Sequence, residues 1–236
     1  MLAGPLMGLE LSEANKLTFA HHGAHRIRSA VSAATVDGIA SAVSCLPPGN
    51  AGTRLHGITA LRPLLAPTGP VGAVAASVLG DACQPVRAIL FDKTHAINWS
   101  LAWHQDRTIA VQKRIDVDGF GPWTVKSGLL HVAPPFDLLA RMVTLRVHLD
   151  PVPATNAPLL IAPGSHRLGR IPEAELPRVV RQCGTLACLA ERGDIWLYAT
   201  PILHASEAAL KPAHRRVLQV DFAVGELPGG LRWLGI

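Results

Sequence analysis

Residues 195–224 read IWLYATPILHASEAALKPAHRRVLQVDFAV. This stretch holds two runs of the apolar, aromatic and β-branched residues that buried strands prefer, Ile195–Ala199 and Val217–Val224, with a mixed connection between them. From Val86 onward the chain repeats this texture in short runs that Gly, Pro, Asn and Asp interrupt. Further strands are expected near Val86–Phe91, Ile97–Trp103, Thr108–Val111, Leu129–Val132, Met142–Leu149, Leu159–Ala162 and Leu186–Leu189. So many short strands indicate a β-sandwich or barrel.

The first 85 residues differ and are expected to form a helical layer over this β core. Apolar residues recur there at spacings of three and four, which predicts one amphipathic helix with Thr35 as its N-cap and with Val36, Ile39, Val43 and Leu46 on its buried face. A second helix is expected from about residue 70 to 80. With residues 86–236 as the core, residues 1–236 are predicted to form a single domain, mainly β with flanking helices.

Two segments of the core are expected to lie outside its strands. Residues 171–181 begin with a proline near their start and are expected to form a short helix. Residues 116–127 carry two glycines and a proline and are expected to form a loop. With the corner Pro134-Pro135-Phe136, this loop is expected to cover the pocket and to become ordered when substrate binds, through Phe120, Trp123 and Lys126.

The composition is that of a soluble globular protein, because 49% of its 236 residues are hydrophobic and 17% are charged. No uncharged stretch is long enough and free enough of proline to span a membrane, and the first ten residues lack the basic start of a secretory signal. A cytoplasmic location without a membrane partner is therefore expected. The four cysteines form no C-x-x-C pair and are expected to be reduced thiols.

The net charge of +5 arises from 22 basic and 17 acidic residues. Basic residues never occur in a run longer than two, and no series of aromatic residues alternates with them, as it does in proteins that bind single-stranded nucleic acid. Nucleic acid is therefore not an expected partner. A preference for anionic small molecules fits the positive charge equally well.

Of the eleven histidines, the most informative lies in the sequence Trp103-His104-Gln105-Asp106. In an extended strand, residues two apart point to the same side, so His104 and Asp106 can reach one point while Gln105 faces away. Taken alone, such a pair is more often a surface histidine beside a carboxylate than a metal site. A third ligand is needed.

His204 is the best candidate for that third ligand, because it lies between two predicted strands. Two imidazoles and one carboxylate on one side of a metal leave three adjacent positions open, which is the facial triad of non-haem Fe(II) oxygenases. A 2-oxo acid would take two of these positions and dioxygen the third. The far carboxylate of such an acid requires a guanidinium, and Arg215 lies eleven residues after His204 at the start of the next strand.

Arg216 competes with Arg215 for this role, since strand alternation allows only one of them to point inward. The face that holds Arg216 also carries Leu218, Val220 and Phe222. If that apolar face were the interior, Arg216 would be the inward arginine. By the same alternation, Thr144, Arg146 and His148 share one face of their strand, from which one or more of them can reach the cavity.

Taken together, these motifs resemble the phytanoyl-CoA dioxygenase family of Fe(II)/2-oxoglutarate oxygenases. The resemblance runs from about residue 86 to the C-terminus. The segments that carry it are Leu90-Phe91-Asp92-Lys93 with Asn98, Trp103-His104-Gln105-Asp106, Asn156-Ala157-Pro158-Leu159, Ala162-Pro163-Gly164-Ser165-His166, His204-Ala205-Ser206 and Arg215. One departure is Ala157, where the family usually has Gly, and it puts the shape of that loop in question.

The resemblance implies a double-stranded β-helix core, the cupin-like jelly roll, with His104, Asp106 and His204 binding iron. It also implies that Arg215, favoured over Arg216 by the family's spacing, anchors 2-oxoglutarate. It makes His166 a structural loop residue rather than the third ligand. Lys93 flanks the approach to the site and is expected either to bind cosubstrate or substrate or to be a solvated strand end.

The implied activity is oxidation by O2 with Fe(II) and 2-oxoglutarate, most simply hydroxylation of a C–H bond of a small molecule with release of succinate and CO2. A carboxylate at Asp106 favours hydroxylation, because related halogenases have a small residue there. Two alternatives remain at this point: a jelly-roll protein that binds metal without chemistry, as a sensor does, and a cupin-type zinc isomerase or hydrolase, which would not require Arg215. The substrate and the oligomeric state are not specified by these motifs.

Overall fold

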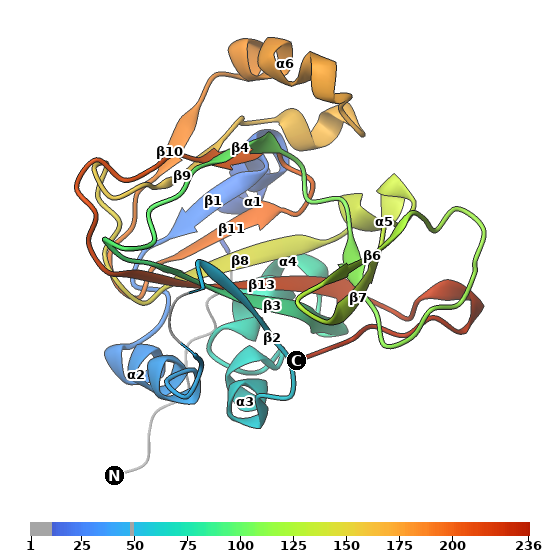
Figure 1. Ribbon diagram of the computed structural model, residues 1–236, viewed down its shortest axis with the longest axis horizontal. Helices are drawn as coiled ribbons and strands as arrows, with labels where there is room; N and C mark the ends of the chain where they lie inside the picture. Colours follow the sequence, from blue (N-terminus) through green and yellow to red (C-terminus); the bar gives the residue numbers. More distant parts are fainter. Residues whose placement is uncertain (1–10, 48–49) are drawn as a thin grey trace.

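A six-stranded antiparallel sheet forms the centre of the computed structural model, which describes residues 11–47 and 50–236 (Figure 1). Its strands, in spatial order, are β1 (Ala24–Ile27), β11 (Ile195–Ala199), β8 (Val143–His148), β13 (Arg215–Val224), β3 (Cys83–Lys93) and β2 (Gly52–Leu55). A four-stranded sheet faces it and consists of β10 (Leu186–Cys188), β9 (Leu159–Ile161), β12 (His204–Ser206) and β4 (Leu101–His104). A three-stranded sheet lies at one end, with β5 (Ile109–Ala110), β7 (Leu129–Val132) and β6 (Trp123–Lys126).

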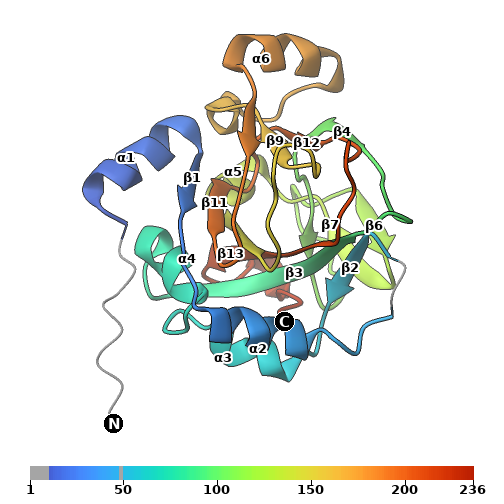
Figure 2. The same cartoon turned by 90° about the vertical axis from the view of Figure 1, so that its left-hand side faces the viewer.

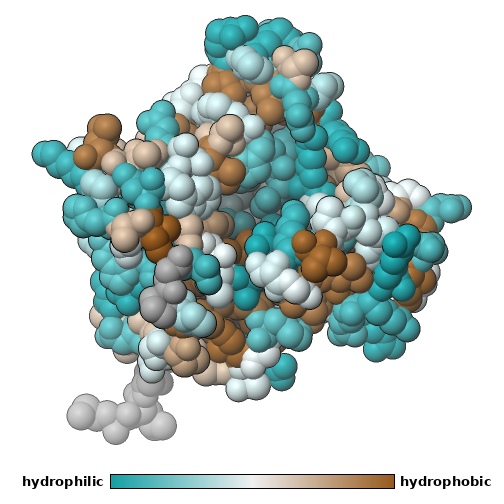
Figure 3. All heavy atoms as spheres, in the orientation of Figure 1, coloured by the Kyte–Doolittle hydropathy of each residue, from teal (hydrophilic) through white to brown (hydrophobic). Residues whose placement is uncertain are grey.

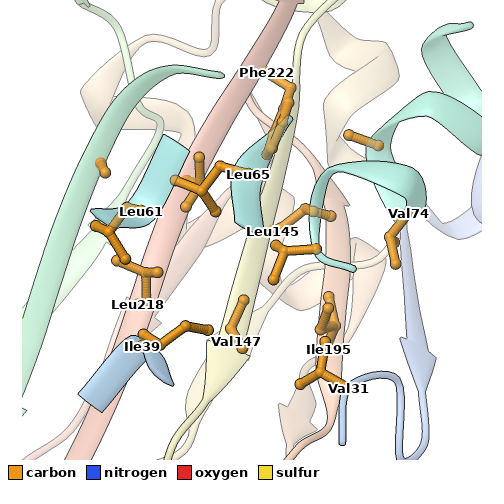
Figure 4. Close-up of a cluster of buried hydrophobic side chains, with 14 of the residues drawn as sticks. Val31, Ile39, Leu61, Leu65, Val74, Leu145, Val147, Ile195, Leu218 and Phe222 are labelled. Carbon is orange, nitrogen blue, oxygen red and sulfur yellow. The ribbon is translucent and has the colours of Figure 1, made fainter. Parts of the chain in front are cut away.

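One face of the large sheet is covered by helices (Figure 2). They are α2 (Ala33–Ala42), α3 (Arg62–Leu65), which follows the 3₁₀ turn Thr59–Leu61, and α4 (Gly72–Leu79). Buried side chains from both layers interdigitate there, as Ile39, Leu61 and Val74 do with Leu145, Leu218 and Phe222 (Figure 4). Burial of this apolar surface is the main favourable contribution to folding.

Further helical segments lie around the edges of the sheets. The helix α1 (Glu13–His22) precedes β1, α5 (Phe136–Ala140) precedes β8, and α6 (Leu176–Cys183) lies beyond the four-stranded sheet. Short 3₁₀ turns span Ser165–Leu168, Glu173–Glu175 and Pro228–Gly230. None of the helices in the described part of the chain has the length and apolar run that a membrane crossing requires.

Most predicted strands are present, and the mainly β class is confirmed. Strands β7 and β11 have the predicted bounds, because each is a short apolar run ended by turn residues. Strand β4 begins at Leu101 rather than at Ile97. Asn98, which lies in the part of the predicted strand that does not form, instead bonds the backbone of Ala209. Its side-chain amide donates to the Ala209 carbonyl, and its side-chain oxygen accepts from the Ala209 amide.

One helix boundary and three strands differ from the sequence prediction. The N-cap of α2 is Ser32, whose hydroxyl accepts a hydrogen bond from the Thr35 amide, so Thr35 lies inside the helix and not at its start. Strands β1 and β2 lie in the segment where only helices and irregular structure were expected, and β6 lies in the predicted loop 116–127. Strands β1 and β2 have few apolar residues, and partners far along the chain position them. Strand β6 instead forms a hairpin with the next strand, β7, across the two residues Ser127 and Gly128.

The packing of sheet on helices predicts a large effect for Leu145→Ala. Leu145 is fully buried between the two layers, so truncation is expected to lower the free energy of unfolding by about 2–5 kcal/mol through lost burial and a residual cavity. The matched control is Leu210→Ala at a residue that is 83% exposed, where a change within about 0.5 kcal/mol is expected. Urea unfolding measures the free energy of unfolding of both variants, and an equal loss in Leu145→Ala and Leu210→Ala would contradict this packing.

Candidate active site

Three potential metal ligands meet where β4 ends and β12 begins. His104 is the last residue of β4, His204 is the first residue of β12, and the two are directly paired across the antiparallel ladder. Their ring centroids are 4.2 Å apart. One ligand atom from each of His104, Asp106 and His204 lies within 4.8 Å of the other two. The strand pairing therefore brings together the three residues that the sequence predicted.

Backbone hydrogen bonds fix the orientation of both imidazoles. His104 Nδ1 lies 2.8 Å from the Ala102 carbonyl oxygen, and His204 Nδ1 lies 2.9 Å from that of Ile202. A carbonyl oxygen only accepts, so each Nδ1 carries a hydrogen, and in the neutral form of each ring Nε2 is the nitrogen with the free lone pair. Burial, and after it the neighbouring His104, lowers the pKa of His204 to about 4. Neutral imidazoles with a free Nε2 are the form that binds a metal.

The carboxylate of Asp106 is held by Arg87, which reaches it from β3. Arg87 Nη2 lies 2.9 Å from Asp106 Oδ2, and Arg87 Nε lies 2.5 Å from Asp221 Oδ2. Asp221 also accepts a hydrogen bond of 3.0 Å from the Thr144 hydroxyl. Burial opposes ionisation of Asp106, but the positive charge of Arg87 outweighs it and holds the pKa of this carboxyl well below its usual range. Asp106 is thus an ionised carboxylate in a fixed position, which suits it to bind a metal.

The three residues open into a pocket of about 520 Å³ between the large and the four-stranded sheet. The molecule is visibly hollowed at the centre of the face shown in Figure 3, with hydrophilic residues along much of the rim. The volume is in the usual range for small-molecule sites. Among the described lining residues Asp106 is the one carboxylate, whereas the basic residues are Arg54, Arg87, Lys93, Arg107, Lys126, Arg146 and Arg215. The pocket therefore favours anions.

Arg215 lines this pocket, and Arg216 does not. Arg216 points to the other side of β13 and forms a two-pronged ion pair with Asp150, at 2.8 and 2.9 Å. The apolar face of β13 that Arg216 shares packs against the helices rather than against the pocket. The polar face is the inward one, and on it Arg215 Nη1 donates to the Ala157 carbonyl while Nε is buried without a hydrogen-bond partner.

Lys93 is buried beside Arg215 and is not a solvated strand end. Its ammonium donates to the carbonyl oxygens of Trp99 at 2.7 Å and Glu207 at 3.1 Å and to the Ser206 hydroxyl at 3.2 Å. These contacts use all three of its hydrogens, so Lys93 connects β3 to the edge of β12 and adds positive charge to the pocket. Burial, then Arg215 and Arg146, lower the pKa of Lys93 to about 8.

Comparison with known proteins identifies the family. The family model of phytanoyl-CoA dioxygenase (PhyH) matches residues 19–217. The chain belongs to the phytanoyl-CoA dioxygenase family. Members of this family are Fe(II)/2-oxoglutarate-dependent oxygenases, as the sequence motifs implied. A search of curated proteins finds no significant match to this chain.

Solved structures share the fold at low sequence identity. EctD from S. alaskensis, crystallised with 2-oxoglutarate and 5-hydroxyectoine, aligns with a TM-score of 0.71 and 17% identity over 99% of this chain and 83% of that chain. The carbocyclase SnoK from nogalamycin biosynthesis gives 0.67 and 15% over 99% and 91%. HygX from Streptomyces hygroscopicus, with nickel and 2-oxoglutarate bound, gives 0.62 and 16% over 91% and 87%. The predicted cupin-like jelly roll is confirmed, although its sheets do not close into a barrel.

The family motif around His166 is structural. Ser165 Oγ accepts a hydrogen bond of 2.9 Å from the amide of Leu203, directly before His204. The backbones of Ala162 and Leu203 are joined by a further bond of 2.9 Å. The His166 ring itself lies against Gly23, where a side chain would meet it, and outside the group of potential metal ligands. This turn therefore supports the start of β12.

The departure from the family pattern at Ala157 leaves the loop in the glycine-type conformation. Ala157 has a φ of +51°, in the left-handed region that favours glycine. This conformation presents its carbonyl oxygen to Arg215. The substitution changes the residue type but keeps the backbone that orients the guanidinium.

The sequence motifs did not indicate Arg87, and of the residues that they did place near the pocket only some line it. Arg87 lies inside an apolar strand run, which is its only local signal, and its partner Asp221 is 134 residues away. Arg146 lines the pocket as its strand face predicted, and it donates to Gln219 Oε1 at 2.9 Å. Of the predicted cover, Lys126 lines the pocket, whereas Phe120 and Pro135 line a separate cavity of about 200 Å³.

The geometry of the three ligands predicts a strong dependence of metal binding on His204. His204→Ala is expected to weaken Fe(II) binding by more than about 100-fold, since even residues that only orient ligands contribute about 10–100-fold. Anaerobic calorimetric titration with Fe(II) measures the affinity. His166→Ala is the matched control and should retain the wild-type affinity; wild-type affinity in His204→Ala would refute its assignment as a ligand.

The position of Arg87 between two carboxylates predicts a large loss of stability in Arg87→Met. This change leaves Asp221 buried without its cationic partner, which is expected to lower the free energy of unfolding by about 3–5 kcal/mol. In the control Arg114→Met an exposed pair with Asp116 is lost, and the expected change is about 0–1 kcal/mol. Denaturant unfolding of the metal-free protein measures both free energies of unfolding. A loss in Arg87→Met as small as that in Arg114→Met would show that Arg87 does not stabilise these charges.

Proposed function

We propose that this chain is an Fe(II)- and 2-oxoglutarate-dependent dioxygenase that hydroxylates a C–H bond of a small molecule. In the overall reaction, one oxygen atom of O2 becomes the hydroxyl group and the other enters succinate as 2-oxoglutarate loses CO2. The observation that carries the proposal is the convergence of His104, Asp106 and His204 in one pocket with the buried guanidinium of Arg215.

The donor set fits Fe(II). Two imidazoles with free Nε2 atoms and one ionised carboxylate form the 2-His-1-carboxylate set that leaves adjacent positions open. His104, Asp106 and His204 would hold the ion. The hydrogen bonds that the two imidazoles donate to the Ala102 and Ile202 carbonyls, and the one that Asp106 accepts from Arg87, would keep these ligands oriented before the ion arrives. Bound iron would supply the activation of O2, which no side chain can perform.

Arg215 is proposed to bind the far carboxylate of 2-oxoglutarate. Its guanidinium has a buried Nε without a partner, and no carboxylate of the described residues forms an ion pair with it. Burial, and after it the positive charge of Arg146, lower the pKa of Arg215 to about 9. An incoming carboxylate would relieve both penalties and form charge-assisted hydrogen bonds with the planar group.

The other residues around this end of the pocket are proposed to orient the cosubstrate and to exclude water. Lys93 and Arg146 add positive charge, and the Arg146 guanidinium lies 5.0 Å from the centre of the Phe91 ring. The apolar side chains of Ile89, Phe91 and Leu159 line the same pocket. A pocket that is dry around the reacting bond protects a reactive species from water.

Hydroxylation is the simplest outcome that the ligand set allows, because Asp106 occupies the position that halogenases keep free. Related folds include an epimerase, SnoN, and a carbocyclase, SnoK, so substrate placement rather than the fold selects the outcome. A metal-binding protein without chemistry would have no need for an unpaired cation buried beside the metal ligands, which favours the enzyme over the sensor.

Formation of succinate from 2-oxoglutarate by the purified protein, with Fe(II) and O2 and without added substrate, tests the proposed function. Wild type is expected to form succinate slowly, and His104→Ala is expected to form none because it lacks a metal ligand. Absence of succinate from iron-loaded wild type would contradict the proposal.

The assignment of Arg215 predicts a split between two neighbouring arginines. Arg215→Gln is expected to raise the 2-oxoglutarate concentration needed for half-maximal succinate formation by about 10–100-fold, as loss of one charge-assisted contact costs about 1.5–3 kcal/mol. Arg216 lies outside the pocket, so Arg216→Gln is expected to change this 2-oxoglutarate concentration by less than about threefold. The reverse order would assign the cosubstrate to Arg216.

A further inference from the structure

Among the positive charges that line the pocket, those of Lys93 and Arg54 lie at different places along the large sheet. Lys93 is paired with Arg215 across β3 and β13, whereas Arg54 on β2 is paired with Ile89. Ile89 and Lys93 are four residues apart on β3, which corresponds to about 13 Å along the strand. The proposed cosubstrate anchor therefore belongs to one end of the pocket, and Arg54 belongs to the other.

Arg54 lies next to Lys126 at this second end. Arg54 Nη1 donates to the Ser127 hydroxyl at 3.2 Å, which joins β2 to the end of β6 (Figure 2). Lys126 Nζ contacts the Thr108 hydroxyl at 3.1 Å, and Thr108 follows Asp106 by two residues. Both cations line the pocket. The two side chains thus line the pocket from two different sheets, and they are close enough for their charges to repel each other.

Neither cation has a negative partner in the described part of the chain. Asp106 is paired with Arg87 and belongs to the metal ligands, and Asp221 is paired with Arg87 and Thr144. Arg54 Nε is buried and has no hydrogen-bond acceptor. Burial, followed by the positive charge of Arg87, lowers the pKa of both Arg54 and Lys126. Both charges are partly buried, and the carboxylate that attracts them, Asp106, is already paired with Arg87, so an anionic ligand would lower the cost of burying them.

2-Oxoglutarate bound through Arg215 and the metal would leave this second end free. One short diacid cannot place its far carboxylate at Arg215, chelate the metal and also neutralise Arg54 and Lys126. The pocket of about 520 Å³ has room for a second small molecule beside it. Its position next to Asp106 is where the substrate bond must lie to be oxidised.

We infer that Arg54 and Lys126 bind an oxyanion, a carboxylate or a phosphate, of the primary substrate and hold its reacting bond toward the metal ligands. The substrate class is therefore a small organic acid or phosphate ester rather than a neutral molecule. This inference rests on the proposed function, because it places the primary substrate beside a metal and 2-oxoglutarate. It adds a specificity-determining pair that lies apart from the cosubstrate anchor.

Direct binding of three probes tests the inference: inorganic phosphate, benzoate and, as the uncharged match, benzamide. Each is titrated calorimetrically into protein loaded with Fe(II) and 2-oxoglutarate under anaerobic conditions, at constant ionic strength set by chloride. Saturable binding of phosphate or benzoate is expected, and benzamide is expected to bind at least about tenfold more weakly. The preferred anion distinguishes a phosphate ester from an organic acid. Equal binding of benzoate and benzamide, with none of phosphate, would overturn the inference.

Charge substitutions connect the binding to these two residues. Lys126→Gln and Arg54→Gln are each expected to weaken anion binding by about tenfold, whereas Lys126→Arg keeps the charge and is expected to stay within about threefold of wild type. Lys113→Gln, at an exposed lysine outside the pocket lining, should bind as wild type does. Wild-type anion affinity in Lys126→Gln and Arg54→Gln would overturn the assignment.

Failure of this inference can be distinguished from failure of the proposed function. Wild-type succinate formation without added substrate reports the proposed function and needs no anion at Arg54 and Lys126. The anion titrations are repeated with metal-free protein in the absence of 2-oxoglutarate. Under these conditions anions can also bind at the cosubstrate end, and the Arg215→Gln variant measures binding without that contribution. Succinate formation combined with anion binding that does not depend on Arg54 or Lys126 would overturn the inference alone.

Discussion

The direct pairing of His104 with His204 across β4 and β12 is the constraint on which the site depends. These strands are short, and the ladder shifts its register within β12, so the pairing is set at the two histidines rather than by a long run of hydrogen bonds. Supports on both sides hold it in place. The turn at Ser165 binds the backbone before His204, and Lys93 binds the residues that end β12. A shift of one residue would turn one imidazole to the opposite face.

The large sheet separates packing from chemistry by its two faces. One face is apolar and is buried against α2, α3 and α4, which supplies stability without any constraint on the site. The other face carries the buried polar groups Arg87, Thr144, Arg146, Gln219 and Asp221, which are joined to one another by hydrogen bonds and an ion pair. Buried polar groups without a partner are costly, and the proposed cosubstrate and substrate would supply partners near the unpaired groups of Arg54, Arg146 and Arg215.

The sequence allowed prediction of those features that depend on local pattern. Apolar runs located β7 and β11. Period two placed Thr144, Arg146 and His148 on one strand face, of which Arg146 lines the pocket. The spacing of His104, Asp106, His204 and Arg215 predicted residues that the fold brings to one pocket. Strand alternation alone could not decide whether Arg215 or Arg216 points into the pocket. The pocket faces the polar side of β13 because the helices cover its apolar side, and the alternation does not show which side they cover.

Other features could not be predicted because distant partners determine them. The sequences of β1 and β2, AHRI and GTRL, have no strand-like alternation, and each becomes a strand by pairing with the edge of the large sheet. Arg87 has its role only through Asp221 and Asp106, and Arg54 approaches Lys126 only because β2 meets the end of β6. Long-range pairings of this kind leave no signal in a single segment.

Anaerobic titration of the metal-free protein with Fe(II) and 2-oxoglutarate tests the central claim most directly. Chelation of a 2-oxo acid by ferrous iron on the three ligands is expected to produce a visible metal-to-ligand charge-transfer absorbance. This absorbance should saturate at one equivalent of iron, and it should require both components. If folded protein bound Fe(II) and 2-oxoglutarate and no such absorbance developed, the two would not share a site and the proposed active centre would be wrong.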